Sequence, residues 1–251
     1  MIYIFETKDY ELWNGDCLEL MQNIPDKFAD MILCDLPYGI TAKNKWDIII
    51  PFEPLWEQYE RIIKDNGAIV LFGQDKFTAE CMLSNRRLHR YNLIWKKVLP
   101  SGFLNANRMP LREHEDIMVF YKKLPTYNPQ KFKGNPCHTR GVISKTNEVQ
   151  HKNDNYGDFK CVETEGDMKF PTSVLEFSKP HPSISVHPTQ KPVELLEWLI
   201  KTYTNEGEIV VDNCMGSGST GVSALKTGRK FLGIELEQDY FDIAQSRMAQ
   251  I

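Results

Sequence analysis

Strand-like and helix-like segments alternate along most of this chain, and this alternation constrains the fold more than any other feature. Short apolar runs of strand length are followed by longer segments with helical periodicity. The expected strands are 10–13, 30–34, 68–72, 91–95, 116–121, 208–211 and 229–234, and the expected helices are 18–24, 52–64, 75–85, 192–203, 220–226 and 239–249. Such alternation predicts an α/β fold with a mostly parallel sheet and right-handed crossovers.

The alternation fails between residues 124 and 186. This segment is rich in Pro, Asn and Lys and has few long apolar runs. A long irregular insertion inside a compact domain is usually functional or mobile. We therefore expect three parts, namely residues 1–123, an insertion at 124–186, and residues 187–251.

Charge and cysteine content exclude some classes of protein and leave the partner open. The formal net charge of −4 does not by itself indicate a nucleic-acid-binding protein, although segments 86–97 and 122–152 are basic. A solvated loop surface would explain either cluster taken alone. The six cysteines form no C-x-x-C pair, so we expect neither a metal site nor a disulfide framework. The absence of a membrane span or signal peptide leads us to expect a cytoplasmic protein.

The first candidate site follows the strand expected at 30–34. Asp35-Leu36-Pro37-Tyr38 begins where this apolar run ends, and ligands bind at the carboxyl ends of strands in open α/β sheets. The Asp35 carboxylate and the two following carbonyls can accept hydrogen bonds from an amino group, and Tyr38 can stack on a planar ring. The tetrapeptide suits a flat aromatic amine, although an ordinary turn explains it equally well in isolation.

The second candidate site follows the strand expected at 208–211. Asp212 leads into the glycine-rich turn 213–221, and glycines let backbone N–H groups approach a ligand closely. This turn is not a P-loop, because it lacks the G-K-[ST] sequence. Glu235 ends the next strand, roughly 20 residues beyond the glycines, where an acidic residue commonly binds ribose hydroxyls.

These residues together suit an adenosine that carries a positively charged amino-acid arm. Asp212 is placed to receive an ammonium group and Glu235 to receive ribose hydroxyls. S-adenosylmethionine matches this combination better than NAD, because the turn has no pyrophosphate to neutralise. Two other interpretations stay open, namely Glu235 as a helix N-cap and the glycine turn as an NAD site.

Three motifs in one order resemble those of the amino-group DNA methyltransferases. They are Asp35-Leu36-Pro37-Tyr38, His187-Pro188-Thr189-Gln190-Lys191-Pro192 and Asp212-Asn213-Cys214-Met215-Gly216-Ser217-Gly218. Their order, with the catalytic motif first, resembles the beta subgroup, and the match covers nearly the whole chain outside the insertion. The resemblance implies a Rossmann-like, seven-strand S-adenosylmethionine-dependent methyltransferase fold, circularly rearranged so that the chain starts near its third strand. It makes 1–123 the catalytic half, 124–186 the target-recognition insertion and 187–251 the cofactor-binding half.

The resemblance also assigns roles residue by residue. The catalytic residues would be Asp35, Leu36, Pro37 and Tyr38. The residues around S-adenosylmethionine would be Asp16, Cys17, Asp35, Thr189, Lys191, Asp212, Asn213, Gly216, Ser217, Gly218 and Glu235. Among these, Asp16 would bind the adenine, Glu235 the ribose, and Lys191 the carboxylate of the cofactor.

Two places depart from the family pattern. Leu36 stands where the family usually has Pro, and since this position contributes mainly its carbonyl, we expect activity to survive. Asn213-Cys214 stands where the family usually has Pro-Phe. The much smaller Cys214 leaves a gap beside the cofactor that we expect a neighbouring side chain to fill.

DNA is the partner that the resemblance implies, with the target base flipped out of the duplex. Asp35 favours the N6 amine of adenine over the N4 amine of cytosine, because the cytosine enzymes more often have Ser at this position. The basic residues expected to contact DNA are Lys131, Lys133, Arg140, Lys145, Lys152, Arg108 and Arg112.

Other functions remain compatible with the sequence. These are cytosine-N4 methylation, methylation of RNA or of a protein amide, and a DNA-binding module whose cofactor site has decayed. The intact Asp35, Tyr38 and Glu235 argue against decay. The resemblance also allows a homodimer, although no apolar stripe demands one. The recognition sequence and any partner restriction nuclease of a restriction–modification system are not specified by these residues.

Overall fold

The computed structural model describes residues 3–39, 47–135, 151–153, 157–159, 167–179 and 190–251. These residues belong to two compact units. One comprises Met1–Asn128 with Ser173–Ile251, and the other comprises Pro129–Thr172. The larger unit carries the two candidate sites.

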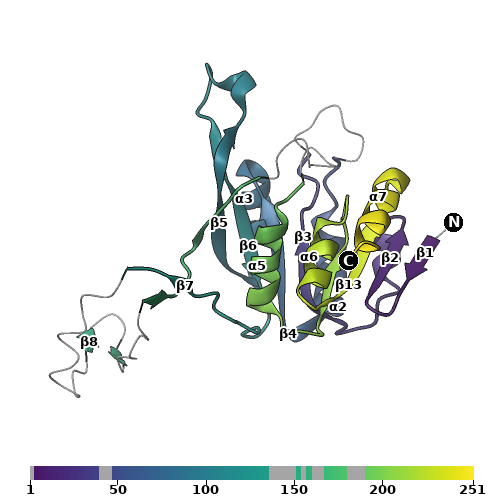
Figure 1. Ribbon diagram of the computed structural model, residues 1–251, viewed down its shortest axis with the longest axis horizontal. Coiled ribbons are helices and arrows are strands. Elements are labelled where there is room, and N and C mark those ends of the chain that lie inside the picture. Colours follow the sequence, from purple (N-terminus) through teal and green to yellow (C-terminus); the bar gives the residue numbers. More distant parts are fainter. Residues whose placement is uncertain (1–2, 40–46, 136–150, 154–156, 160–166, 180–189) are drawn as a thin grey trace. The chain divides into compact units, whose positions relative to one another are not determined.

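The larger unit is built on a nine-stranded sheet in the order β1-β2-β13-β12-β3-β4-β6-β5-β11 (Figure 1). Its strands are β1 (Tyr3–Glu6), β2 (Tyr10–Asn14), β3 (Ala29–Cys34), β4 (Ile63–Gly73), β5 (His89–Ser101), β6 (Arg112–Phe120), β11 (Val174–Phe177), β12 (Ile209–Asp212) and β13 (Lys230–Glu235). The seven strands from β2 to β5 form the expected sheet, which β1 and β11 extend at its edges. The last strands of the chain, β12 and β13, lie between β2 and β3, so the circularly rearranged α/β fold is confirmed.

Helices cover both faces of this sheet. They are α1 (Cys17–Met21), α2 (Phe52–Ile62), α3 (Asp75–Ser84), α5 (Val193–Tyr203), α6 (Ser219–Lys226) and α7 (Gln238–Met248). In β3, Met31 and Leu33 pack in the core that includes α5, α6 and α7, whereas Ile32 and Cys34 pack in the core that includes α1, α2 and α3. Because alternate residues of a strand point to opposite faces, this strand is buried on both sides, as its continuous apolar run predicts.

Strand direction gathers the candidate residues at one edge of the sheet. The strands β2, β13, β12, β3 and β4 run parallel to one another. The strand β6 runs antiparallel to both β4 and β5, so β4 and β5 also share a direction. The loops that follow β2, β3, β12 and β13 therefore leave the sheet at the same edge, where an open α/β sheet binds its ligand.

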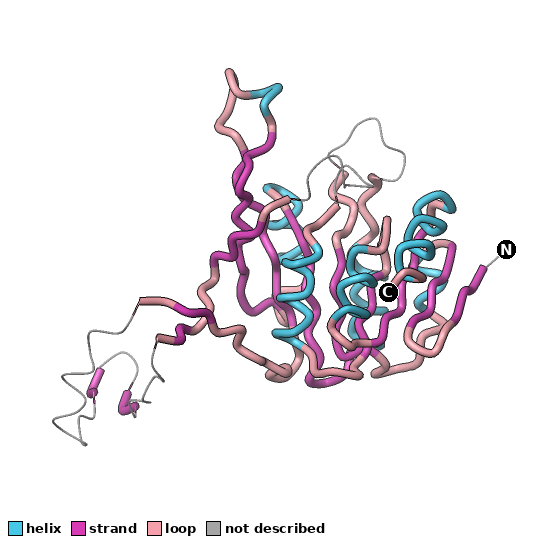
Figure 2. The backbone as a smooth tube through the Cα atoms, in the orientation of Figure 1, coloured by secondary structure: helices cyan, strands magenta, loops and turns pink. Residues whose placement is uncertain are grey.

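The strands β5 and β6 are longer than the sequence indicates. The apolar pattern predicts strands at 91–95 and 116–121, but pairing continues to Ser101 opposite Arg112. The two strands form a hairpin whose far end projects beyond the rest of the sheet (Figure 2). This far end has no apolar alternation, because its residues pair with each other and cover no core.

The segment expected to be an insertion contributes to both units. Its strand β11 pairs in parallel with β5 and so extends the main sheet. Only Leu175 of this edge strand is buried, so its sequence gives little strand signal. In the smaller unit, β7 (Phe132–Lys133) pairs with β10 (Met168–Lys169), and β8 (His151–Asn153) pairs with β9 (Gly157–Phe159). The assignment of 124–186 to target recognition stays a prediction.

Among the residues with assigned positions, no helix combines the length and the apolar character needed to cross a membrane.

Candidate active site

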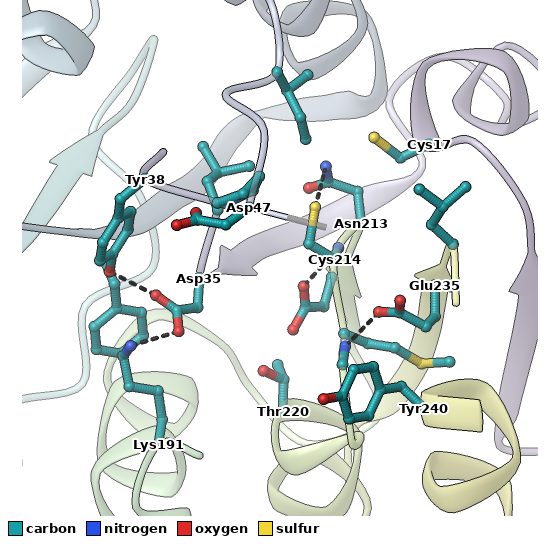
Figure 3. A pocket seen from close by; sticks show the side chains of 18 of the residues that line it. Cys17, Asp35, Tyr38, Asp47, Lys191, Asn213, Cys214, Thr220, Glu235 and Tyr240 are labelled. Carbon is teal, nitrogen blue, oxygen red and sulfur yellow. Dashed lines mark hydrogen bonds and ion pairs between the residues drawn. The ribbon is translucent and has the colours of Figure 1, made fainter. Parts of the chain in front are cut away.

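Both candidate sites open into one pocket of about 490 Å³ at the carboxyl edge of the sheet (Figure 3). Asp35, Tyr38 and Lys191 lie at one end of this pocket, and Cys17, Glu235 and Tyr240 lie at the other. The sequence-predicted residues that line it are Asp16, Cys17, Asp35, Leu36, Pro37, Tyr38, Lys191, Asp212, Asn213, Gly216, Ser217 and Glu235. Two sites recognised separately in the sequence therefore face a common space.

Two residues assigned to cofactor binding stand apart from this group. Thr189 lies outside the described residues. Gly218 does not line the pocket, and its φ of 77° explains why glycine is needed there. A Cβ at Gly218 would come within 2.8 Å of Ala244 Cβ, so this glycine also permits close packing between α6 and α7. A role for either residue in ligand binding stays a prediction.

The Asp35 carboxylate is held by two partners. Its Oδ1 accepts a hydrogen bond of 2.6 Å from Tyr38 Oη, and its Oδ2 accepts one of 2.5 Å from Lys191 Nζ. The Tyr38 ring packs against Phe77, with the ring centroids 4.8 Å apart. A carboxylate has about four lone-pair directions, so Asp35 retains the capacity to accept a further hydrogen bond from a ligand.

A chain of buried charges supports Asp35 from behind. Lys191 Nζ lies 3.2 Å from Glu115 Oε2, and Lys97 Nζ lies 2.6 Å from Glu115 Oε1. Lys97 is 2% exposed and Glu115 8% exposed, so water does little to stabilise these charges. Burial acts to raise the pKa of Glu115, but Lys191 and Lys97 outweigh it and leave this pKa lowered. Burial acts to lower the pKa of Lys191, but Asp35 and Glu115 leave it raised.

Glu115 keeps one unused hydrogen-bonding position. Its Oε2 contacts Lys191 as an ion pair and has no hydrogen-bond partner among the described residues. A buried carboxylate oxygen without a hydrogen bond is uncommon in proteins. Glu115 also lines the pocket, so a bound molecule can approach this side of the cluster.

Lys97 and Glu115 are members of the site that the sequence does not predict. Lys97 lies in the basic segment 86–97, and no motif includes Glu115. The signal lies in strand alternation, because Leu93, Trp95 and Lys97 share one face of β5. In β6, Glu115 shares a face with Ile117 and Val119. In both strands, therefore, a charged residue occupies the next inward-facing position after a series of apolar residues.

At the other end of the pocket, Glu235 receives two backbone N–H groups. Its Oε2 accepts from Gly216 N at 2.8 Å, and its Oε1 accepts from Glu237 N at 2.9 Å. Burial raises the pKa of Glu235, and these backbone donors partly offset the rise. Gly216 has a φ of 51°, and among the described residues, its chain neighbours apart, no atom lies within 4 Å of the place where its Cβ would stand. The backbone here therefore borders open space in which a ligand can fit.

Asp212 lies between the two ends of the pocket and is 2% exposed. Burial raises its pKa to about 6, although hydrogen bonds from Thr220 and the Cys214 N–H act to lower it. A carboxylate in this environment gains strongly from a bound cation, because a cation replaces the solvation that burial removes.

Asp16 has a structural role at the pocket edge. Its Oδ1 caps α1 by accepting hydrogen bonds from Leu18 N at 2.9 Å and Glu19 N at 3.1 Å. The side chain is exposed, and its other oxygen is available to a ligand in the pocket. Capping orients the carboxylate at a helix N-terminus.

The unusual Asn213-Cys214 pair is held by neighbouring polar side chains. Tyr59 of α2 is fully buried and donates a hydrogen bond of 2.5 Å to Asn213 Oδ1. Asn213 Nδ2 in turn lies 3.5 Å from Cys214 Sγ. Burial raises the pKa of the nearby Cys34 thiol to about 12, so this thiol stays protonated and unreactive at neutral pH.

The residues expected to bind DNA belong to both units. Arg108 is exposed near the end of the β5–β6 hairpin, and Arg112 donates to Gln74 Oε1 at 3.2 Å. In the smaller unit, Lys131 lies 4.8 Å from the Phe170 ring centroid, and Lys133 lies 3.4 Å from Asp167. Lys152 belongs to β8, whereas Arg140 and Lys145 lie outside the described residues. Their contacts with DNA stay predictions.

Comparison with known proteins identifies relatives over nearly the full length. A family model described as DNA methylase matches residues 29–246. The Type II methyltransferase M2.MboI of Moraxella bovis is 25% identical, over 98% of this chain and 90% of its own length. The Type II methyltransferase M.BglII of Bacillus subtilis is 29% identical, over 93% of this chain and 67% of its own length.

Solved structures share the fold. The M1.HpyAVI–SAM complex has a TM-score of 0.61 and 24% identity, covering 95% of this chain and 99% of its own. The PvuII DNA methyltransferase, named as cytosine-N4-specific, has a TM-score of 0.67 and 17% identity, covering 96% of this chain and 86% of its own.

Proposed function

The chain belongs to the DNA methylase family that matches residues 29–246, and from this premise we propose that it methylates the N6 amine of a flipped adenine in DNA, with S-adenosylmethionine as methyl donor. One observation carries the proposal. Asp35, at the end of β3, faces the same pocket as Asp212 and Glu235, at the ends of β12 and β13. Asp35, which can accept a hydrogen bond from an amine, therefore lines the same pocket as two acidic residues that suit a cationic nucleoside.

The residues at the far end of the pocket fit S-adenosylmethionine. The open space at Gly216 lies beside Glu235, whose carboxylate suits ribose hydroxyls. The buried Asp212 suits the ammonium group, because a cation there relieves its desolvation. The cofactor, when bound, supplies an electrophilic methyl group on a sulfonium sulfur. A related structure is named as a SAM complex, which supports this assignment.

Asp35 and Tyr38 act on the target base. The lone pair of an exocyclic amine is delocalised into the ring, so the amine is a poor nucleophile. Asp35 accepts a hydrogen bond from the amine, and the Leu36 or Pro37 carbonyl accepts another. Together these bonds hold the nitrogen nearer to tetrahedral geometry. Positioning and charge placement then provide most of the catalysis.

Lys191 and Tyr38 keep Asp35 ready for this role. Lys191 holds one carboxylate oxygen, and the Tyr38 hydroxyl holds the other. The raised pKa of Lys191 keeps this side chain cationic, so it stays a donor to Asp35 and fixes the orientation of the carboxylate. Stacking of the flipped base on Tyr38 offsets about 1–3 kcal/mol of the cost of flipping.

A methyl-transfer assay tests the proposal and separates it from cytosine-N4 methylation. The protein is incubated with unmethylated genomic DNA and isotope-labelled S-adenosylmethionine, and the nucleosides are analysed by mass spectrometry. Labelled N6-methyldeoxyadenosine is the expected product. Labelled N4-methylcytosine would retain the mechanism and overturn the assignment of the base.

Glu235→Gln is expected to weaken S-adenosylmethionine binding about 10- to 100-fold. The substitution removes the charge from hydrogen bonds to the ribose, and such bonds contribute roughly 1.5–3 kcal/mol. Isothermal titration calorimetry measures the change. Glu237→Gln is the matched control, because Glu237 is exposed and its hydrogen bond to Glu235 comes from its backbone N–H, which the substitution keeps. Equal affinity of the two variants would contradict the role of Glu235.

Cofactor affinity is expected to rise about tenfold between pH 5 and pH 7. Burial raises the pKa of Asp212 to about 6, so this carboxyl is mostly neutral at pH 5 and mostly ionised at pH 7. The ionised form is the one that attracts the cofactor ammonium, so affinity increases with pH through this window. Titrations at several pH values should show the rise in the wild type and a nearly flat profile in Asp212→Asn. A rise of equal size in both proteins would assign it to another group.

A further inference from the structure

The end of the β5–β6 hairpin exposes large apolar side chains to solvent. We call residues 98–112 the hairpin tip. Within it, Leu99 is 73% exposed, Phe103 68% and Leu104 fully exposed, and Val98 and Met109 are also exposed. The tip projects away from the sheet, with Phe103 and Leu104 in the short 3-10 turn Phe103–Asn105 (Figure 2). Such a concentration of exposed apolar groups indicates a surface that is covered by a partner.

The root of the same hairpin forms part of the active-site pocket. Trp95 of β5 and Glu115 of β6 both line that pocket. Since β5 runs in the direction of β4, the hairpin leaves the sheet at the edge where β3 ends in Asp35. A partner that delivers a base to Asp35 therefore comes close to the hairpin.

The charge of the tip indicates the chemistry of that partner. The tip contains Arg108 and Arg112 and no acidic residue. An apolar end flanked by cations complements a polyanion with a stacked apolar interior, as duplex DNA has. Minor-groove and architectural proteins insert Phe, Leu or Met side chains between base steps in this way, with cations on the phosphates.

We propose that the hairpin tip is a wedge that enters the DNA duplex beside the extruded base. Phe103 and Leu104 occupy the space that the base leaves and contact its former stacking neighbours, while Arg108 binds a flanking phosphate. The wedge lowers the cost of unpairing and unstacking the target base, which is a few kcal/mol for a paired base. This inference rests on the proposed function, because it requires a base flipped towards Asp35.

The test compares a paired target with one that needs no separation. Once the methylated site is mapped, methyl transfer is measured on a duplex that carries it and on the same duplex with an abasic position opposite the target base. The double variant Phe103→Ser/Leu104→Ser is expected to lose activity about 10- to 100-fold on the paired duplex. On the abasic duplex it should stay within about threefold of the wild type, because that base is already unpaired. Leu83→Ser, at an exposed leucine of α3, is the matched control.

Four results would overturn the wedge. The first is a double variant that is as active as Leu83→Ser on the paired duplex, and the second is an equal loss of activity on both duplexes, which indicates a general contact. The third is a wild type that sediments as a dimer and a double variant that sediments as a monomer, which would assign the tip to contact with a second copy of the chain. Absence of any label in DNA with the wild type would overturn the proposed function itself, and the wedge with it.

Discussion

Asp35→Asn is expected to slow methyl transfer by about 100- to 1000-fold, the usual effect of removing one electrostatic contact to a transition state. Asn keeps the shape of the side chain but has a single acceptor oxygen. In Asp35, one carboxylate oxygen accepts from Lys191 and the other from the Tyr38 hydroxyl. The single oxygen of Asn would have to accept from both of these donors and from the target amine. The amide nitrogen would also face one of these donors, so the amine loses its charged acceptor.

The measurement is a single-turnover rate on duplex DNA, made together with S-adenosylmethionine binding. The affinity for S-adenosylmethionine should change by less than about threefold, because the contact between Asp35 and the amine stabilises the transition state and not the bound cofactor. Asp65→Asn is the control, since Asp65 forms surface ion pairs with Lys27 and Lys123. An Asp35→Asn protein with more than a tenth of the wild-type rate would remove Asp35 from the catalytic role.

Glu115→Leu is expected to lower the free energy of unfolding by about 3–5 kcal/mol, as is typical when one partner of a buried ion pair is removed. The change leaves the Lys97 ammonium, which is 2% exposed, without its carboxylate. Lys191 would lose one of its two acidic partners and keep Asp35. Urea denaturation measures the loss.

A second substitution shows whether the unpaired charge of Lys97 causes the loss of stability in Glu115→Leu. Lys97→Met combined with Glu115→Leu should be more stable than Glu115→Leu alone, because an apolar pair then replaces an isolated buried cation. Lys96→Met is the surface control, since Lys96 pairs with Glu176 in solvent and its loss should change the stability little. A loss below about 1 kcal/mol for Glu115→Leu would show that water reaches the cluster.

Much of the fold and part of the site could be predicted from sequence because local pattern determines them. The apolar run of β3 is buried on both faces, so it appears in the sequence as a continuous signal that ends at Asp35. The same holds for β12, which ends in Asp212. Strand direction then brings these two acids to one edge, and this step follows from topology alone.

Other features depend on partners that are distant in sequence. The burial of Lys97 depends on its ion pair with Glu115, which lies opposite Trp95 and so diagonally across from Lys97 in the register of β5 with β6. The edge strand β11 is assigned by its pairing with β5, because only one of its side chains is buried. The capping role of Asp16 depends on where α1 begins, and a helix of five residues gives a weak periodic signal.

The position of β12 between β3 and β13 has a consequence for the synthesis of the protein. Val210 pairs with Met31, so the centre of the sheet joins two segments that lie far apart in the chain, of which β3 is made first. Pairings between such distant segments form slowly, because a long loop must close first. Until β12 leaves the ribosome, β3 has an unpaired apolar edge of the kind that promotes aggregation. We therefore expect nascent chains of this protein to need protection by chaperones until β12 has been made.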